Sequence, residues 1–351
     1  MMLRPNPIQR VGFTLIEVLI VISIVSILMA LLFPAVQRAR ESMRRTQCIS
    51  NLKNVSLAIA NYESAFRVYP AIRRSVSSIV DDNGEVGLAW TTSILPFIEA
   101  AASADELQDR ITRGTLNDPW NDDKFYRRIY PAGVLACPSD LQTPPTTPKV
   151  TGQLSYRASL GDLIEDNHLR PKNVRGLFGD NSFLRPASVL DGLSNTILLT
   201  EMASAGPGGA KDPVGSILIQ YDGSAYSDLY PGGCVARWES AFIDVQRSDE
   251  RTGTRWADGR PYYAGVVVAL PPNSKKCVSG LHDHLWGVFT AGSRHSGGCN
   301  ISMGDGSVRF ITESIDTGDL SVPGKKTISG ESPYGVWGAM GTRAGRETIR
   351  E

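Results

Sequence analysis

The most informative segment of the chain runs from Ile8 to Val36 and reads IQRVGFTLIEVLIVISIVSILMALLFPAV. Its apolar part, Phe13 to Val36, contains 24 residues. At about 1.5 Å of rise per residue, a helix of this length covers the roughly 30 Å hydrocarbon core of a membrane. The far end of the run offers no small-x-small cleavage site, so we interpret it as a membrane-spanning helix rather than a secretory signal peptide.

One acidic residue, Glu17, interrupts the apolar run. An ionised carboxylate inside a bilayer costs about 2.5 to 3.5 kcal/mol even on lenient insertion scales, so it needs a cationic partner. In the alternative, Glu17 snorkels to the headgroups and the true span begins at Val18. Glu17 also lies in the first turns of the expected helix, where the helix dipole favours an acid.

The string GFTLIEVLIVISIVSILMALLFPAV, preceded by a short polar leader with Arg4 and Arg10, resembles the prepilin-type N-terminal segment of type IV pilins and type II secretion pseudopilins. The resemblance implies that a prepilin peptidase cuts between Gly12 and Phe13 and methylates the new amino group. It also supplies the cation for Glu17, namely the amino terminus of Phe13 on the same or a neighbouring subunit. Glu17 is then an assembly residue, and the expected partners are the peptidase, other pilin-like subunits and the inner membrane.

The distribution of basic residues favours the opposite membrane orientation. Two arginines precede the span, whereas Arg38, Arg40, Arg44, Arg45 and Lys53 follow it. The positive-inside rule would therefore place the large C-terminal part in the cytoplasm. The resemblance implies instead a single-pass protein of the bacterial cytoplasmic (inner) membrane, with its C-terminal head in the periplasm, the extracytoplasmic space or a filament. We adopt that orientation.

Helical periodicity continues beyond the apolar run. Apolar or small residues recur every three or four positions as far as Phe66. A single helix from Phe13 to Phe66 would be about 80 Å long, with a kink near Pro34 because proline lacks an amide hydrogen. The resemblance implies a leader at 1–12. The pattern that follows predicts a transmembrane half of a spine helix at 13–36, an amphipathic half at 37–68 and a head domain at 69–351.

The head shows short β-like runs separated by Gly, Pro, Asn and Asp. The segment TILLTE, from Thr196 to Glu201, predicts a buried strand, as does PYYAGVVVALPP, from Pro261 to Pro272. The segment from Gly87 to Ala101 predicts a short helix, or a strand that ends in one. The predicted fold class is therefore α+β, with a long N-terminal transmembrane spine helix packed on a β-rich, pilin-like globular head.

Overall charge excludes one class of function. The chain has 36 basic and 36 acidic residues and a formal net charge of zero, whereas nucleic-acid binding needs a basic footprint. The hydrolase motifs G-x-S-x-G and H-E-x-x-H and the phosphate loop are also missing. We therefore expect no enzyme activity, although Ser293, His295 and Asp305 provide the residue types of a catalytic triad.

The C-terminal block HSGGCNISMGDG contains His295 followed, after nine residues, by Asp305 and Gly306. With blocks such as LACPSD and DGLSNTILLTEM, it resembles the H-x9-DG signature of a large family of prepilin-leader proteins whose remaining domain has no assigned function. The residues themselves predict a β-hairpin within 295–310, in which Ile301 and Met303 face Val308 and Phe310 across a Gly-Asp-Gly turn.

Metal binding is the sharper alternative for the histidines. His282 and His284 alternate as they would on one face of a strand, and His295 could supply a third ligand. Calcium could bind carboxylates at Asp81 to Glu85 or at Asn117 to Asp123. Both acidic segments also fit ordinary solvated loops. The expected function requires no cofactor.

Five cysteines in an exported head allow at most two internal disulfides. The family resemblance implies that Cys48 pairs with Cys137, because both lie in blocks that recur together in the family. Cys234 with Cys277 is the next candidate pair.

Together these observations predict a pilin-like subunit of a type II secretion or type IV pilus-like assembly. Two alternatives remain. One is a membrane-anchored surface or periplasmic protein that uses the leader only for placement and whose head binds a metal, calcium or a glycan. The other is a tethered hydrolase.

Overall fold

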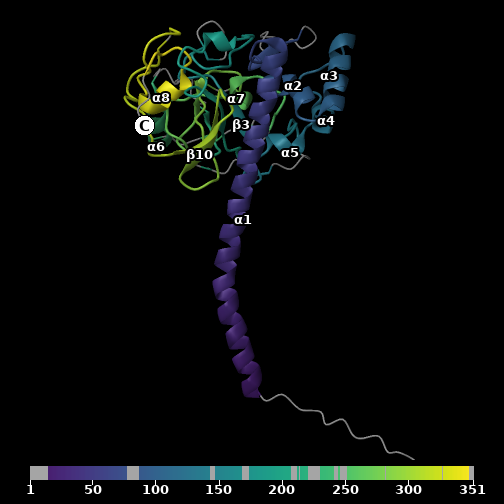
Figure 1. Ribbon diagram of the computed structural model, residues 1–351, viewed down its shortest axis with the longest axis vertical. Coiled ribbons are helices and arrows are strands. Elements are labelled where there is room, and N and C mark those ends of the chain that lie inside the picture. The colour runs from purple at the N-terminus through teal and green to yellow at the C-terminus, as the bar shows by residue number, and fades with distance from the viewer. Residues whose placement is uncertain are drawn as a thin grey trace, which may run out of the picture. The chain divides into compact units, whose positions relative to one another are not determined.

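The computed structural model describes residues 15–76, 87–142, 147–167, 174–206, 212, 214–219, 230–240, 244–245, 251–280, 282–325 and 327–347 (Figure 1). By internal contacts the chain divides into two compact units, Met1–Thr46 and Gln47–Glu351. We refer to them as the N-terminal unit and the head unit. The predicted cleavage residues, Gly12 and Phe13, lie outside the described residues.

Helix α1 runs from Leu15 to Phe66 and so contributes to both units. It continues through Pro34 without a break in its helical assignment. In the N-terminal unit, the large apolar side chains from Leu15 to Val36 are 45% to 82% exposed. In the head unit, the helix buries one face that repeats every three or four residues, made of Cys48, Asn51, Leu52, Val55, Ser56, Ala58 and Ile59. The predicted face is therefore buried at Leu52, Val55 and Ile59, whereas Phe66 at its end is 58% exposed.

The centre of the head is a five-stranded sheet with the order β11-β10-β4-β3-β7. Its strands are β3 (Tyr156–Ser159), β4 (Ile197–Glu201), β7 (Gly265–Val266), β10 (Gly298–Met303) and β11 (Val308–Thr312). Neighbouring strands are antiparallel except for the parallel pair β3 and β7. The buried strand predicted in TILLTE is confirmed as β4.

Two smaller sheets complete the strand structure of the described residues. A four-stranded sheet has the order β6-β5-β8-β9, and a two-stranded sheet pairs β1 with β2. Their strands are β1 (Arg73–Ser75), β2 (Gly87–Ala89), β5 (Leu218–Ile219), β6 (Asp244–Val245), β8 (Cys277–Val278) and β9 (Gly287–Val288).

Short helices lie between and around these strands. Figure 1 shows α3 and α4 together on one side of the head and α8 on the other. The bounds are α2 (Trp90–Ser93), η1 (Leu95–Phe97), α3 (Ala101–Arg113), α4 (Asp123–Arg128), α5 (Ala132–Leu135), η3 (Pro186–Ser188), α6 (Pro231–Ser240), α7 (Pro261–Ala264) and α8 (Gly335–Gly341). The fold is α+β, as predicted.

Two local predictions were wrong in detail. The segment predicted as one buried strand from Pro261 to Pro272 begins instead with helix α7, because a proline at the first helical position is already set for helix. In the hairpin, Ile301 lies opposite Arg309 rather than Val308 or Phe310. Three loop residues, 304–306, separate Met303 from Ser307, whose backbone groups close the hairpin at 2.9 Å. This loop length sets the register one residue away from the predicted one.

The two faces of the central sheet serve different purposes. Cys299 and Ile301 point to one face and join a small apolar cluster with Trp337 of α8. Successive residues of a strand alternate between faces, so Asn300 points to the other face, where it meets Glu201 of β4. Tyr156 lies opposite Glu201 in the register and donates a hydrogen bond of 3.1 Å to the carbonyl of Cys48 in α1. This second face therefore carries the polar contacts to the spine helix.

Candidate functional site

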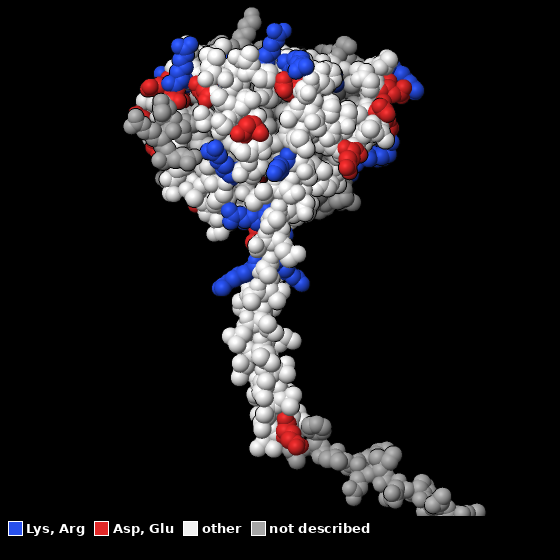
Figure 2. Space-filling model, viewed as in Figure 1, with Lys and Arg blue, Asp and Glu red and all other residues white. Residues whose placement is uncertain are grey.

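The N-terminal unit presents one acid in an apolar surface. Glu17 lies exposed in the first turn of α1. From Val18 to Gln37 the helix has no charged residue, and Figure 2 shows this stretch as a continuous uncharged surface. By length and composition α1 can cross a membrane, with a mean hydropathy of 2.9 over its most apolar window. The arrangement suits a membrane or a set of like subunits as its surroundings, because water would leave the apolar surface unburied.

The head contains both predicted disulfides. Cys48 is bonded to Cys137, and Cys234 to Cys277. The first joins α1 to the segment after α5, 89 residues further along the chain. Asn51, one turn beyond Cys48, donates hydrogen bonds of 3.1 Å to the carbonyls of Gly133 and Ala136 and so fixes the same segment.

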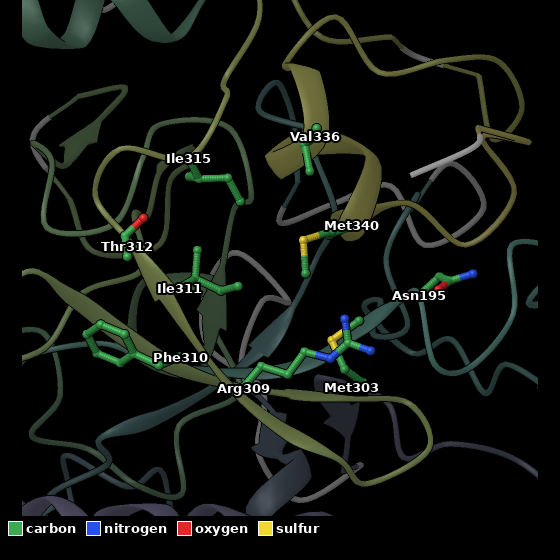
Figure 3. A pocket seen from close by; sticks show the side chains of 9 residues that line it. All are labelled: Asn195, Met303, Arg309, Phe310, Ile311, Thr312, Ile315, Val336 and Met340. Carbon is green, nitrogen blue, oxygen red and sulfur yellow. The ribbon is translucent and has the colours of Figure 1, made fainter. Parts of the chain in front are cut away.

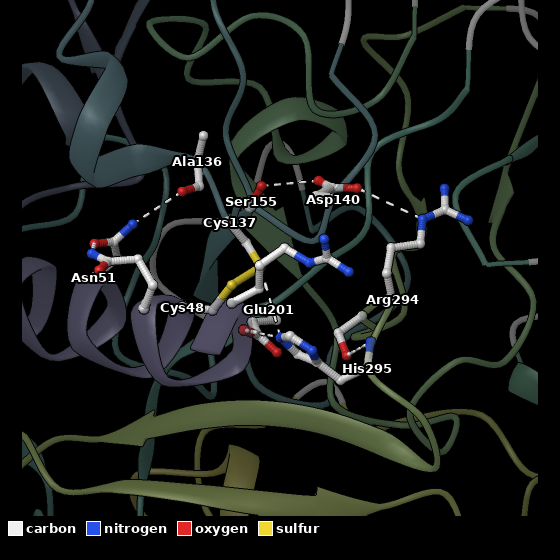
Figure 4. Close-up of a disulfide and its surroundings, with 12 residues drawn as sticks. Cys48, Asn51, Ala136, Cys137, Asp140, Ser155, Glu201, Arg294 and His295 are labelled. Carbon is white, nitrogen blue, oxygen red and sulfur yellow. Dashed lines mark hydrogen bonds and ion pairs between the residues drawn. A yellow bond between two sulfur atoms is a disulfide. The ribbon is translucent and has the colours of Figure 1, made fainter. Parts of the chain in front are cut away.

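His295 lies against the first disulfide (Figure 4). Its Nε2 is 3.7 Å from Sγ of Cys137 and 3.6 Å from Oε1 of Glu201. We call Cys48, Cys137, Glu201 and His295 the disulfide cluster. All four residues are at most 3% exposed. His295 therefore contacts the Cys48–Cys137 disulfide, which we call the helix staple because it joins α1 to the segment after α5.

Asn300 holds the carboxylate of Glu201 in the cluster. Its backbone amide donates to Oε2 at 2.8 Å, and its side-chain amide donates to both carboxylate oxygens at 3.0 Å. A buried carboxylate needs such donors, since an unpaired buried charge is costly. The position of Glu201 is thus fixed by the neighbouring strand.

A second buried acid, Asp140, lies next to the disulfide cluster and organises the loops around it. Its carboxylate accepts hydrogen bonds from Gln153 at 2.7 Å, Ser155 at 2.9 Å and the backbone of Ser204 at 3.1 Å. Nε of Arg294 lies 3.8 Å away. Asp140 follows Cys137 by three residues, so this network anchors the loop that contains one sulfur of the staple.

Arg294 also binds Asp212 through both guanidinium ends. Burial alone would raise the pKa of Asp212, but the hydrogen bond and charge of Arg294 outweigh burial and hold the pKa below its usual range. Nearby, Lys276 is fully buried and donates to the carbonyls of Ala203 and Val214. Burial, reinforced by the charge of Arg157, lowers the pKa of Lys276 to about 7.

The remaining signature residues build the hairpin turn. Asp305 accepts hydrogen bonds from the backbone and hydroxyl of Ser307 at 2.9 and 2.7 Å, and these bonds hold its pKa below the usual range despite partial burial. Gly306 has a φ of +81°, a conformation that favours glycine. The hairpin prediction is therefore confirmed at the turn.

Ser293, His295 and Asp305, which provide the residue types of a catalytic triad, each have other hydrogen-bond or contact partners. Ser293 donates its hydroxyl to the carbonyl of Gly298 at 2.7 Å and accepts from the backbone amide of His295. Asp305 is committed to Ser307 in the hairpin turn. The hydroxyl, imidazole and carboxylate thus have separate structural partners.

His282 and His284 do not join His295 in a ligand set. They lie in a turn rather than on a strand face, with their rings stacked at a centroid distance of 5.1 Å. Among the described residues, the potential metal ligands grouped around His295 are Cys48, Cys137 and Glu201. His282 and His284 therefore lie beside each other in the turn, whereas the group of potential ligands around His295 consists of Cys48, Cys137 and Glu201.

The intervening Asp283 instead belongs to a buried ion network. It binds Arg255 at 3.0 Å, Arg260 at 2.7 Å and the hydroxyl of Tyr263 at 2.6 Å. Burial raises the pKa of Asp283, but the two arginines outweigh it and the net pKa is lowered. This network is structural, because every group in it is saturated by a partner.

The two calcium candidates have different outcomes. The segment from Asp81 to Glu85 lies outside the described residues. In the other segment, Asp122 pairs with Arg110 at 2.5 Å and caps α4 through the backbone amide of Phe125. Asp123 pairs with Arg127. These carboxylates already bind cationic side chains, so their local contacts do not form an oxygen-lined cation cage.

The head also has a groove of about 610 Å³ between the β10–β11 hairpin and α8 (Figure 3). Its apolar lining includes Met303, Ile311 and Met340, with Arg309 and Asn195 at one end. Among the lining residues that the structure describes there is no acid, histidine or cysteine.

Sequence reasoning missed several residues of the buried site. Glu201, Asp140, Arg294, Asn300 and Lys276 were not singled out. Two of them left a signal: Glu201 is a charge at the end of an otherwise apolar strand, and Asp140 closes the block CPSD after a paired cysteine. Buried charges of this kind need partners, but the sequence alone does not name them.

Comparison with known families adds two matches. A model described as the prokaryotic N-terminal methylation motif matches residues 12–33, and one described as a protein of unknown function (DUF1559) matches residues 37–318. No curated protein and no solved structure matches the chain. The methylation motif and the apolar helix identify a pilin-like, membrane-anchored protein. With a match over most of its length, the chain belongs to the DUF1559 family.

Proposed function

We propose that the protein is a pilin-like subunit of a type II secretion or type IV pilus-like assembly, processed between Gly12 and Phe13. The observation that carries the proposal is the apolar surface of α1 in the N-terminal unit, which has a single acid, Glu17, in its first turn and overlaps the methylation motif. An apolar surface of this extent needs lipid or other subunits to cover it.

Glu17 has a physical role in this proposal. After cleavage, the positively charged amino terminus would belong to Phe13, four residues before Glu17 in the sequence, which is the spacing of about one turn in a helix. Pairing between this amine and the carboxylate of the same or a neighbouring subunit would compensate both charges in an apolar environment. Such a pair also fixes the axial alignment of one subunit against the next.

The disulfides support a head outside the cytoplasm. Disulfides persist in oxidising compartments and are rare in the bacterial cytoplasm. We therefore assign the protein a single pass through the inner membrane with the head on the periplasmic or extracytoplasmic side, against the positive-inside count. Protease added outside spheroplasts should digest the head. Protection of the head without lysis would reverse this orientation.

The proposal gives the head a structural rather than an enzymatic role. The signature residues support this assignment, because His295 contacts the staple and Asp305 holds a turn.

The first test is the N-terminal residue and mass of the protein isolated from its native membrane. We expect a chain that begins with N-methylated Phe13. An intact Met1, or cleavage beyond Val36, would contradict the processing step and with it the role of Glu17.

The second test separates an assembly subunit from an anchored binding protein. We expect Glu17→Ala to leave membrane insertion intact but to remove the protein from sheared filaments and from cross-linked subunit ladders. Glu41→Gln is the matched control. It removes another acid of the N-terminal unit, and this acid pairs with Arg44 on the helix surface. Processed protein that never enters an assembly, with or without Glu17, would favour the anchored binding protein.

A further inference from the structure

The disulfide cluster has the composition of a metal site. Ligand atoms from Cys48, Cys137, Glu201 and His295 all lie within 4.8 Å of one another, and all four residues are buried. Two sulfurs, one imidazole nitrogen and one carboxylate oxygen form a four-ligand set of the kind that zinc accepts. In the oxidised protein the two sulfurs are bonded to each other, so they are not available as thiolates.

The distances around His295 already match a tetrahedral site. With zinc–ligand bonds of about 2.0 to 2.3 Å, neighbouring ligand atoms of a tetrahedron lie about 3.3 to 3.8 Å apart. Nε2 of His295 is 3.7 Å from Sγ of Cys137 and 3.6 Å from Oε1 of Glu201. Both of these edges therefore lie within the tetrahedral range, and the two bonded sulfurs must separate for a metal to enter.

We propose that reduction of the Cys48–Cys137 disulfide opens a tetrahedral zinc site formed by Cys48, Cys137, Glu201 and His295. A dithiol reductant would be oxidised to its own disulfide while it delivers two electrons and two protons to the sulfurs. Zinc then binds the two thiolates, and the two thiol protons leave to solvent. The metal would replace the disulfide as the link between α1 and the segment after α5.

The surroundings are already arranged to support such a site. Asn300 fixes Glu201 through three hydrogen bonds, which is the arrangement that orients a carboxylate ligand and sets its position before metal arrives. A small cavity of about 10 Å³ borders Cys137, Glu201 and Ser293. The cavity gives the sulfur of Cys137 limited room to move when the disulfide opens.

The reductant must come from outside the protein. Cys299 is the free cysteine among the described residues, but it points to the opposite face of the sheet from Asn300 and Glu201. Burial and the charge of Glu201 also raise its pKa well above the usual range, so its reactive thiolate is disfavoured. Internal exchange with Cys299 is therefore not a route to the reduced site.

The test uses the full chain in detergent, with and without reduction by a phosphine, which takes oxygen from water as it delivers electrons to the disulfide. Zinc alone is the probe, with metal content measured after dialysis and protons released measured in weak buffer. We expect about one zinc and two protons per reduced chain and none per oxidised chain. Cobalt in place of zinc should give the visible absorption of a tetrahedral thiolate site.

Variants locate the metal. Cys48→Ser with Cys137→Ser, and His295→Ala, should abolish binding, whereas Cys234→Ser with Cys277→Ser should retain it as the matched disulfide control. Asn300→Ala keeps all four ligands and should weaken zinc affinity about 10- to 100-fold. His282→Ala should have no effect.

Either of two results would overturn the proposal. One is that the reduced wild-type chain takes up no zinc. The other is that the oxidised chain and the reduced His295→Ala variant take up as much zinc as the reduced wild-type chain. The cobalt spectrum of the wild-type protein tests for the tetrahedral thiolate site without any substitution, so this result does not depend on whether the variants fold. Because none of these measurements depends on assembly, the outcome is independent of the proposed pilin-like function.

Discussion

The N-terminal unit and the head unit differ in which side chains they expose to solvent and which they bury. The first exposes large apolar side chains, with Leu15 at 82% and Phe33 at 69% exposure. The second buries charged ones: Arg157, Arg175 and Asp162 are each fully buried. Exposed apolar surface is stable only where the surroundings are not water, and buried charge is stable only where the protein supplies every partner. The contrast indicates that the surface of the N-terminal unit suits apolar surroundings, whereas the head unit is built as a protein core surrounded by water.

Helix α1 contains both behaviours within one element. Leu28 is 53% exposed, whereas Leu52 is fully buried in the head core. Helix propensity does not distinguish these two leucines, since both are strong helix formers. Their roles differ only because the head packs against one of them. Substitutions in each unit should therefore have very different effects on unfolding of the head.

The largest effect should come from breaking a buried ion pair. Asp162 accepts a hydrogen bond of 2.5 Å from Nε of Arg175, and both side chains are inaccessible to solvent. Asp162→Ala leaves the buried guanidinium of Arg175 without its carboxylate, with only backbone carbonyls as acceptors, and should lower the free energy of unfolding by about 3 to 5 kcal/mol. Urea unfolding of the detergent-solubilised protein measures this loss.

The matched control removes the exposed Arg113–Asp109 pair of α3. Asp109→Ala should change the free energy of unfolding by less than about 1 kcal/mol, because exposed pairs contribute little. Equal losses for the two aspartates would mean that burial of charge does not set the stability of the head.

The next effect tests the two halves of α1 directly. Leu52→Ala removes a fully buried side chain and should cost about 2 to 5 kcal/mol. Leu57→Ala, at a position 59% exposed in the head unit, and Leu28→Ala, in the N-terminal unit, should each stay within about 0.5 kcal/mol in the same measurement. Destabilisation of the head by Leu28→Ala would contradict the division of the helix into two environments.

A third prediction uses the titration of Lys276. Its pKa is lowered to about 7 in the folded protein, against about 10.4 in an unfolded chain. Between these values the unfolded chain binds one more proton than the folded one, so this group makes stability rise with pH, by up to about 1.4 kcal/mol per unit. Lys276→Met should remove the rise.

Urea unfolding at pH 7 and pH 9 tests this prediction by comparing the pH dependence of the variant with that of wild type. Lys275→Met, at the neighbouring and partly exposed position, should keep the wild-type rise. If wild type and Lys276→Met show the same dependence, the buried lysine is not the source of it.

The smallest effect concerns the hairpin turn. An added Cβ at Gly306 would meet no atom within 4 Å, so Gly306→Ala tests backbone strain alone. At a φ of +81° the cost should be about 1 to 2 kcal/mol, and less for Gly306→Asn, because asparagine tolerates this region better. A neutral alanine variant would show that the signature glycine is kept for a reason other than the turn.

Features that depend on neighbouring residues could be predicted from the sequence alone. The apolar run and the spacing of three and four fixed α1 and its buried face, and the Gly-Asp-Gly segment fixed a turn at Asp305 and Gly306. Family resemblance supplied the cysteine pairing. These features follow from helical and turn geometry, which is set within a few residues along the chain.

The surroundings of the signature histidine, in contrast, depend on the tertiary structure. His295 meets Cys137 across 158 residues, and Asn300 meets Glu201 across 99. The sequence suggested that His295 could join His282 and His284 in a metal site, but the chain path places His295 beside Cys48, Cys137 and Glu201 instead. Contacts at such separations depend on strand order, register and the route of the connecting loops. No local pattern encodes them, because many chain paths share the same local periodicity.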